Sequence, residues 1–242
     1  MAAQGSPDVV ISQVYGGGGN SGATLRNDYI ELFNRGKSAV SVSGWSVQYT
    51  SATGTEWQVT PISGIVQPGA YYLVREAEGA NTAAVDIPAP DASGTIAMSA
   101  TAGKVALSRT GTALSGPRPA DASVVDLVGY GQPNGFEGSA PARTLSNTTA
   151  ALRRSNGCTD TDDNGNDFTP SEPQPRNSAT APAVNCDAIS QVVPLTISQI
   201  QGTGATSAYA GQTVSTRGVV TGRKGDGFWL QSLPADVDQN AA

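Results

Sequence analysis

The densest group of side chains able to bind a metal ion lies between residues 160 and 167. Asp160, Asp162 and Asn164 stand at alternate positions, followed by Gly165 and then Asp167. Oxygen ligands at this spacing, with a glycine for the sharp turn, are typical of a calcium loop, because Ca²⁺ is a hard cation. The sequence therefore suggests a calcium site formed by Asp160, Asp162, Asn164 and Asp167, and Ca²⁺ is the one cofactor that it suggests.

The rest of this segment favours a structural role for the same residues. Ser171 stands where a calcium loop needs its bidentate glutamate, Glu172 comes one position late, and no flanking helices are predicted. Short acidic and amide side chains also cap turns by accepting hydrogen bonds from nearby backbone N–H groups. We expect turn capping to be the main role, and calcium binding stays the alternative.

Two other patterns that could carry chemistry are weak. The glycine-rich loop Gly16–Gly22 returns to a strand and has Arg26 as its nearest basic residue, whereas a phosphate loop leads into a helix and usually supplies a lysine. We expect it to be a flexible hairpin loop. Asp28 and Glu31 fall on opposite faces of one strand, so they are not a pair for acid–base chemistry.

The absence of histidine limits the chemistry further. The 242 residues include no histidine, which excludes Ser-His-Asp and Cys-His arrangements, and we assign no catalytic residue. The net charge of −6 disfavours general nucleic-acid binding, which depends on basic side chains. The two basic doublets, Arg153–Arg154 and Arg223–Lys224, are expected to be solvated strand ends or turns.

Cys158 and Cys186 are the only cysteines, and no histidine accompanies them as a metal or catalytic partner. We expect a disulfide that closes the proline-rich segment between them and adds roughly 3 kcal/mol of stability, the alternative being two free buried thiols. A disulfide fits a secreted protein. The first residues show no secretory signal, and no apolar run approaches the ~20 residues of a membrane span.

The elements that position these residues are short strands separated by turns. Alternating or β-branched runs predict a half-buried strand at 9–15 and further strands that we list by number: 28–34, 45–49, 56–59, 71–74, 104–108, 123–130 and 151–154. The segment 77–95 is predicted to be a long surface loop. Trp45, Tyr49 and Trp57 could form a ligand platform, but core packing is the favoured interpretation. This pattern predicts an all-β protein with a β-sandwich.

The ordered motifs of the N-terminal half resemble a known family. The run ISQVYGGGGNSGATLRNDYIELFNRG, followed by SGWSVQY, resembles the bacterial lamin-tail domain, an immunoglobulin-like β-sandwich. A DxxNxxDF segment and a PxPxN run, similar to those that end this domain in secreted proteins, occur here as Asp163, Asn164, Asp167, Phe168, Pro173, Pro175 and Asn177. The resemblance implies a lamin-tail domain over residues 8–178. It implies a fold, whereas an activity has to be argued from a site.

A second unit is expected after a proline-rich, disulfide-closed linker at 179–194. Strands predicted at 195–202, 213–221 and 228–231 resemble the opening half of an OB-like β-barrel, so residues 195–242 are expected to be an incomplete OB-like segment. In secreted bacterial nucleases, a domain of this kind lies between a lamin-tail domain and an endonuclease/exonuclease/phosphatase catalytic domain. That catalytic chemistry uses histidine, which this chain lacks.

The resemblance therefore implies a non-catalytic N-terminal region of a secreted bacterial nuclease that positions the enzyme on its substrate or on a cell surface. The catalytic domain is expected downstream in the parent chain. Extracellular DNA, a protein or a cell-surface polymer are the partners that fit. An adhesion or surface-anchoring module of an exoprotein unrelated to nucleases is the alternative. No binding residue is assigned from the sequence.

Overall fold

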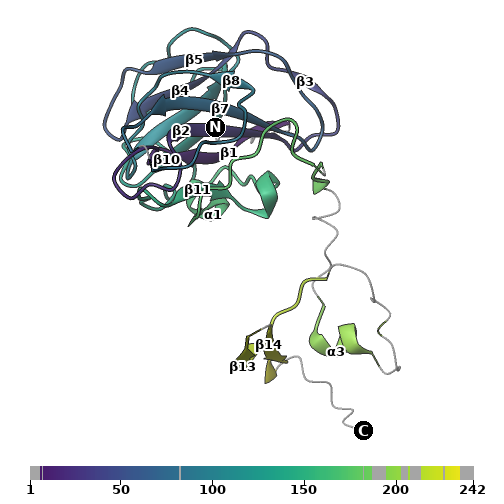
Figure 1. The fold of residues 1–242 in the computed structure, drawn as a ribbon. Coiled ribbons are helices and arrows are strands. Elements are labelled where there is room, and N and C mark those ends of the chain that lie inside the picture. The colour runs from purple at the N-terminus through teal and green to yellow at the C-terminus, as the bar shows by residue number, and fades with distance from the viewer. Residues whose placement is uncertain are drawn as a thin grey trace. The chain divides into compact units, whose positions relative to one another are not determined.

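The computed structural model describes residues 6, 8–81, 83–181, 183–186, 195–202, 207, 214–225 and 227–234. The chain divides into two compact units, Met1–Cys186 and Asp187–Ala242. The first unit contains most of the strands (Figure 1). None of the described helices is long and apolar enough to cross a membrane.

The first unit is built from two main sheets. The six-stranded sheet has the order β12 (Phe168–Ser171), β11 (Ala150–Arg153), β1 (Val9–Tyr15), β2 (Asn27–Asn34), β7 (Tyr71–Glu78) and β8 (Ala92–Ser93). The four-stranded sheet has the order β10 (Val124–Tyr130), β9 (Gly103–Ser108), β4 (Trp45–Ser51) and β5 (Gln58–Ile62). A small pair, β3 (Val40–Ser41) and β6 (Ile65–Val66), a 3-10 turn, η1 (Ser155–Gly157), and a short helix, α1 (Asn164–Asp167), complete it.

Side chains of both sheets meet in one hydrophobic core, which confirms the predicted sandwich. A register shift between Ile11 and Gln13 in β1 changes which residues face inward, so that Val14 joins the core. Tyr49 and Trp57 are buried, which confirms the packing interpretation of these aromatic residues. The central strands contribute Val9, Ile11, Val14, Ile30, Leu32, Val47, Tyr49, Val105, Leu107, Val128 and Tyr130.

The outer face of the six-stranded sheet is covered as well. The strand predicted at 9–15 is confirmed as β1, but the expectation that it is half-buried was wrong, because every residue of β1 and β2 is buried. Val10, Phe33 and Tyr71 pack on this outer face beneath Val184 and the two cysteines. We call residues 172–181 and 183–186 the C-terminal arm, because they follow β12, the last strand of the first unit, and cover the sheet.

The outer face of the four-stranded sheet is covered by the segment that joins β9 to β10. The indole of Trp57 packs with Leu114, and its Nε1 donates to the carbonyl oxygen of Gly116 over 3.0 Å. Lys104 is fully buried and donates to the carbonyl oxygens of Gly54 and Pro117, at 2.7 and 2.9 Å. A buried ammonium needs such acceptors, so Lys104 ties several loops to the sheet.

Two loop predictions need correction. The glycine-rich loop is not a loose connection, because residues 16–19 are buried. A side chain at Gly18 would lie 2.0 Å from the backbone of Asn27, so the glycine permits a close approach of two backbones. The expected surface loop at 77–95 is shorter than predicted, because β7 continues to Glu78 and β8 pairs with β7 in parallel.

The second unit contains a short helix, α3 (Ile197–Gln201), and a hairpin of β13 (Val219–Lys224) and β14 (Gly227–Gln231). The strand predicted at 195–202 was therefore wrong. Thr196 caps the helix by accepting from the backbone N–H of Gln199, whose side chain in turn accepts from the N–H of Thr196. This capping box stabilises a helix start that alternation alone does not reveal. Residue 213 of the predicted second strand lies outside the described residues.

Candidate functional site

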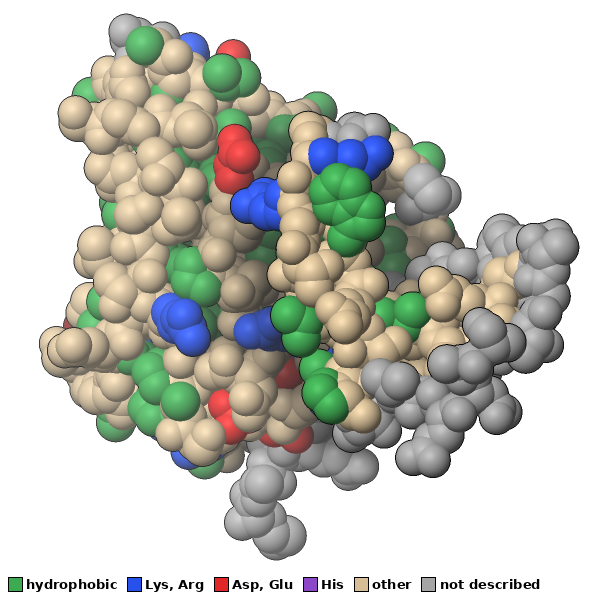
Figure 2. All heavy atoms as spheres, turned by 90° about the horizontal axis from the view of Figure 1, so that it is seen from below, with side chains coloured by type: hydrophobic (Ala, Val, Ile, Leu, Met, Phe, Trp, Pro, Cys, Tyr) green, Lys and Arg blue, Asp and Glu red, His purple; other side chains and the backbone are tan. Residues whose placement is uncertain are grey.

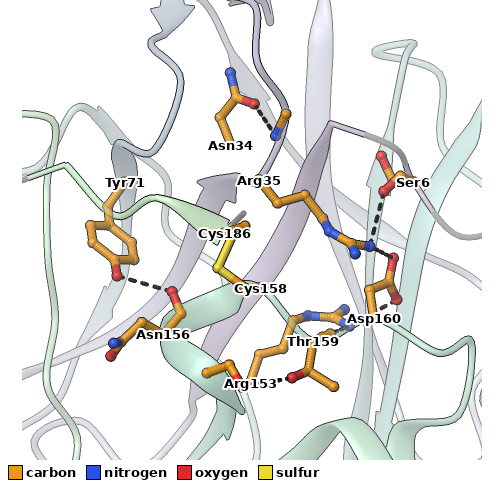
Figure 3. The surroundings of a disulfide bond; sticks show 12 residues. Ser6, Asn34, Arg35, Tyr71, Arg153, Asn156, Cys158, Thr159, Asp160 and Cys186 are labelled. Atoms are coloured by element: carbon orange, nitrogen blue, oxygen red, sulfur yellow. Dashed lines mark hydrogen bonds and ion pairs between the residues drawn. A yellow bond between two sulfur atoms is a disulfide. The ribbon is translucent and has the colours of Figure 1, made fainter. Parts of the chain in front are cut away.

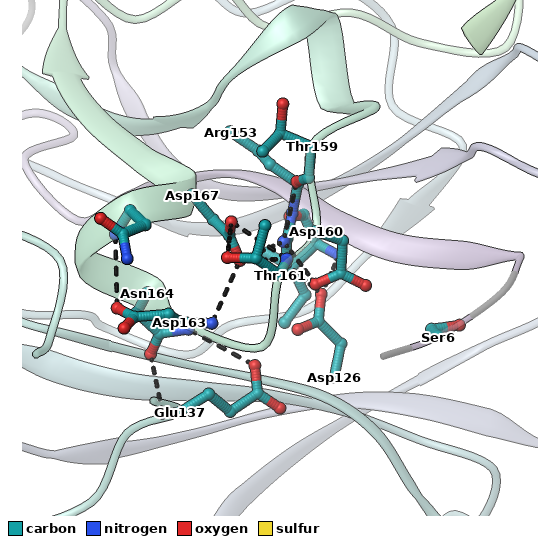
Figure 4. Close-up of polar contacts among 12 residues, drawn as sticks. Ser6, Asp126, Glu137, Arg153, Thr159, Asp160, Thr161, Asp163, Asn164 and Asp167 are labelled. Carbon is teal, nitrogen blue, oxygen red and sulfur yellow. Dashed lines mark hydrogen bonds and ion pairs between the residues drawn. The ribbon is translucent and has the colours of Figure 1, made fainter. Parts of the chain in front are cut away.

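Arg153, at the end of β11, is the centre of a buried cluster of charges (Figure 4). The side chain is fully buried, and its guanidinium lies 2.6 Å from Asp126, 2.9 Å from Asp160 and 3.5 Å from Asp167. Its Nε donates to the carbonyl oxygen of Ile11 over 2.7 Å. The expectation that Arg153–Arg154 is a solvated doublet was therefore wrong for Arg153, although Arg154 is exposed.

Asp160 and Asp167, two of the predicted calcium ligands, belong to this cluster. Asp160 also pairs with Arg35 over 3.0 Å, and both carboxylate oxygens of Asp167 accept from the backbone N–H of Thr161. Asn164 points elsewhere, because its Oδ1 accepts from the N–H groups of Gly129 and Glu137. The positive charges at this place are the guanidinium groups of Arg153 and Arg35.

Two further observations bear on the predicted metal site. Asp162 has a positive φ of 53°, and Asp163 caps α1 by accepting from the N–H groups of Gly165 and Asn166. In the described part of the chain, no group of three or more acidic or cysteine side chains could hold a metal ion. The contacts thus support turn capping and ion pairing, and calcium binding by Asp160, Asp162, Asn164 and Asp167 stays a prediction from the sequence.

Cys158 and Cys186 form a disulfide with a Cα–Cα distance of 5.4 Å, as predicted (Figure 3). The bond fixes the end of the C-terminal arm to the turn that follows η1. Nearby, Val184 N donates to Gly69 O over 2.8 Å, and Tyr71 Oη donates to Asn156 O over 2.9 Å. Residues 183–186, which the sequence assigns to a linker, thus pack on the first unit.

The middle of the C-terminal arm is held by an ion pair that the sequence did not reveal. Arg176 lies 2.8 Å from Glu31, which is fully buried on the outer face of β2. Its guanidinium also stacks on the Tyr71 ring at 3.7 Å from the centroid. Burial raises the pKa of Glu31, while the charge of Arg176 opposes that shift. Glu31 therefore anchors the arm and is not available for chemistry.

Asp28 and Glu76 are buried inside the sandwich, where they hold two loops. Asp28 accepts from the N–H groups of Gly18 and Met98, each over 2.8 Å, and Glu76 accepts from Ile96 N over 2.9 Å. Burial raises the pKa of Asp28 to about 6 and that of Glu76 to about 7. The hydrogen bonds of both carboxylates are to groups inside the first unit, which indicates a structural role.

The raised pKa values predict that the protein loses stability as the pH rises. Burial raises the pKa of Glu137 to about 9, with the negative charge of Asp126 as a further cause. Because the folded state keeps protons that the unfolded chain has released, the free energy of unfolding falls between about pH 4 and pH 9. One pKa unit corresponds to about 1.4 kcal/mol, so the rise of the Glu76 pKa from 4.5 to about 7 by itself corresponds to a decrease of roughly 3 kcal/mol.

Urea unfolding at several pH values measures this decrease. Glu76→Gln and Glu137→Gln replace each carboxyl with a neutral group of the same shape, so each variant should flatten the decrease in its own pH range. A free energy of unfolding that is constant or rises from pH 5 to pH 9 contradicts the prediction.

Figure 2 shows one face with mainly backbone and uncharged side chains, among which hydrophobic, acidic and basic side chains are scattered. The hairpin of the second unit differs, because two adjacent aromatic residues are exposed there. Phe228 is 62% and Trp229 is 56% exposed, beside the exposed Val219 and Val220. Arg223 lies directly opposite Phe228 in the hairpin register.

Arg223 and Lys224 are exposed at the end of β13, as expected for a solvated strand end, whereas Phe228 and Trp229 were predicted only as part of a strand. Trp229 stands opposite Gly222, and its ring lies 2.9 Å from where a side chain at Gly222 would begin. The sequence signal for this exposed group was a basic doublet followed within a few residues by Phe-Trp. Such a combination of aromatic faces and cations is the exposed group in the described chain that best suits ligand binding.

Two stacked sheets of mainly antiparallel strands around one core define an immunoglobulin-like β-sandwich. The lamin tail domain family model matches residues 2–158, and the chain therefore belongs to the lamin tail domain family.

Among solved structures, the chain is similar to a DUF4876 family protein from Bacteroides thetaiotaomicron. The identity is 12% and the TM-score 0.46, over 75% of this chain and 76% of that one. No curated protein matches the chain. Its family defines an immunoglobulin-like module of a binding or structural kind.

Proposed function

We propose that this chain is a non-catalytic binding region of a secreted bacterial nuclease, which it holds on single-stranded nucleic acid. Three facts support a binding role: membership of the lamin tail domain family, the absence of histidine, and buried carboxylates engaged in internal contacts. The disulfide supports an oxidising location outside the cytoplasm. The nuclease context is proposed from the resemblance of the sequence order, a lamin-tail-like region before an OB-like one, although the first strand predicted in the OB-like region is the helix α3.

The exposed hairpin of β13 and β14 carries the nucleic-acid part of the proposal. Phe228 and Trp229 point to opposite faces of β14, since successive residues of a strand alternate. Each face therefore presents one aromatic ring, and Arg223 lies beside Phe228. Between residues 217 and 229 the sequence holds three cations, Arg217, Arg223 and Lys224, and one acid, Asp226. The local charge is positive although the whole chain is acidic.

This combination fits the chemistry of a single strand. Unpaired bases stack on aromatic rings, each stack contributing roughly 1–3 kcal/mol, and the phosphates are attracted to nearby cations. Binding of this type weakens with salt, with a slope of about 0.7 per neutralised phosphate for single strands. A duplex hides its base faces, so we expect it to bind more weakly than a single strand.

The test is fluorescence anisotropy of a labelled oligothymidine with the full chain at several salt concentrations. Phe228→Ala and Trp229→Ala should each weaken binding by roughly tenfold, and Arg223→Gln should weaken binding and reduce the salt slope. Ile65→Ala is the matched control, because Ile65 is 58% exposed on the first unit. Equal affinities of the wild type and the aromatic variants would overturn the proposal.

A further inference from the structure

A pocket on the first unit has a lining that none of the roles above uses. It lies in the segment that joins β9 to β10, over the outer face of the four-stranded sheet, and has a volume of about 530 Å³. Small-molecule sites typically measure roughly 300–1,000 Å³. One wall is formed by residues 110 and 112–115, and the other by residues 119–121 and 123.

The first wall is fixed by two buried side chains of β4. Ser46 Oγ donates to Thr110 O over 2.6 Å, and Gln48 Nε2 donates to Thr112 O over 2.9 Å. Gln48 also accepts from Leu114 N over 2.8 Å, and the Leu114 side chain is buried beside Trp57. The side chains of Ser46 and Gln48 are both fully buried. This wall therefore keeps its shape without a ligand.

The second wall is fixed by the ends of β9 and β10. Ser123 Oγ bonds to Ser108 Oγ over 3.1 Å, and Arg109 N donates to Ser123 O over 2.8 Å. Asp121 accepts from Ser123 N over 2.7 Å and is exposed. Hydrogen bonds from Ser123 lower the pKa of Asp121, so this carboxylate stays ionised. A pocket with two fixed walls loses little conformational entropy when a ligand binds.

The lining selects the chemistry of the ligand. Of the nine lining residues, four carry a hydroxyl, one is the carboxylate of Asp121, and none is basic. Hydroxyls both donate and accept, and a carboxylate accepts from two donors, so the lining suits a ligand with several hydroxyl groups. Pro119 and the exposed Ala113 and Ala120 add apolar surface for the C–H face of such a ligand. The unpaired negative charge disfavours anions.

We propose that this pocket binds a neutral sugar unit of a polysaccharide. It would give the chain an attachment point separate from the hairpin that contacts nucleic acid, and it does not depend on that function. A neutral saccharide donates its hydroxyl protons to Asp121 and exchanges hydrogen bonds with Thr112 and Ser123. Repulsion from Asp121 weakens the binding of an acidic sugar.

The test is amide NMR of the full chain titrated with a neutral disaccharide such as cellobiose, and with galacturonate as the anionic probe. The neutral sugar should shift amides of residues 110–123, and galacturonate and oligothymidine should not. Thr112→Val should lower the affinity for the neutral sugar by roughly threefold to tenfold, because one hydrogen bond is lost. Asp121→Asn keeps the acceptor for Ser123 N and should admit galacturonate.

Thr148→Val is the matched control, because Thr148 is an exposed threonine in another loop. It should leave sugar binding unchanged, and unchanged amide spectra outside 110–123 show that each variant folds. The proposal is overturned if none of a panel of neutral saccharides shifts these amides, or if galacturonate shifts them equally in the wild type.

Discussion

Replacing Arg153 with methionine is expected to lower the free energy of unfolding by roughly 3–5 kcal/mol at neutral pH. Methionine fills much of the same space but leaves Asp126, Asp160 and Asp167 without the guanidinium that lies between them. Carboxylates buried without a partner are strongly unfavourable. Arg35 still pairs with Asp160, so most of the lost stability comes from the unpaired carboxylates of Asp126 and Asp167.

Urea unfolding followed by tryptophan fluorescence measures this loss. Arg154→Met is the matched control, since Arg154 is the exposed neighbour, and its effect should be small. Acidification should restore part of the stability of the Arg153→Met variant relative to the wild type, because protonated carboxyls no longer need the cation. If the two methionine variants are equally stable, Arg153 does not hold the cluster together.

Removing the disulfide is expected to cost about 3–4 kcal/mol, the value for closing a loop of this length in the unfolded chain. The two cysteines are 28 residues apart, and their bond fixes the end of the C-terminal arm. In the double variant Cys158→Ser/Cys186→Ser, the arm keeps the Arg176–Glu31 pair but loses its fixed end. Phe33 and Tyr71 should then become more accessible.

Two measurements check this prediction. The double variant should melt at a lower temperature than the wild type, and a thiol reductant should lower the melting temperature of the wild type only. Hydrogen exchange should speed up in β1 and β2, whose outer face lies under the arm. Equal melting temperatures of the oxidised and reduced wild type would show that the arm is held by its other contacts alone.

The sandwich was predictable because its strands carry local signals. The alternation in Asp28–Asn34 places Ile30 and Leu32 in the core as expected. The two cysteines offered a single intramolecular pairing, and the disulfide joins them. The alternation of a strand depends only on neighbouring residues, and two cysteines in one chain can form only one intramolecular disulfide.

The role of Arg153 could not be predicted, because it depends on residues far apart in the sequence. Its partners include Ile11 and Asp126, which lie 142 and 27 positions away. Nothing in the doublet Arg153–Arg154 shows which arginine faces inward. The spacing of Asp160, Asp162 and Asn164 likewise resembles a calcium loop, whereas the tertiary fold brings an arginine to Asp160.

The covered outer faces were missed for the same reason. In a strand with one solvated face, apolar and polar residues alternate, and the sequence of β1 shows this alternation in part. Its polar residues Ser12 and Gln13 are nevertheless buried, because they hydrogen-bond to Glu31 at 2.6 and 2.9 Å. Polar side chains with buried partners look like surface residues in a sequence.

The most direct test of the central claim measures binding and cleavage on one labelled oligonucleotide. The full chain is incubated with single-stranded DNA in the presence of Mg²⁺ or Ca²⁺, and anisotropy is followed by electrophoresis of the same sample. Our account predicts that the oligonucleotide is bound, that binding weakens with salt, and that the strand stays intact. Cleavage by the wild type, or no binding at low salt, would contradict it.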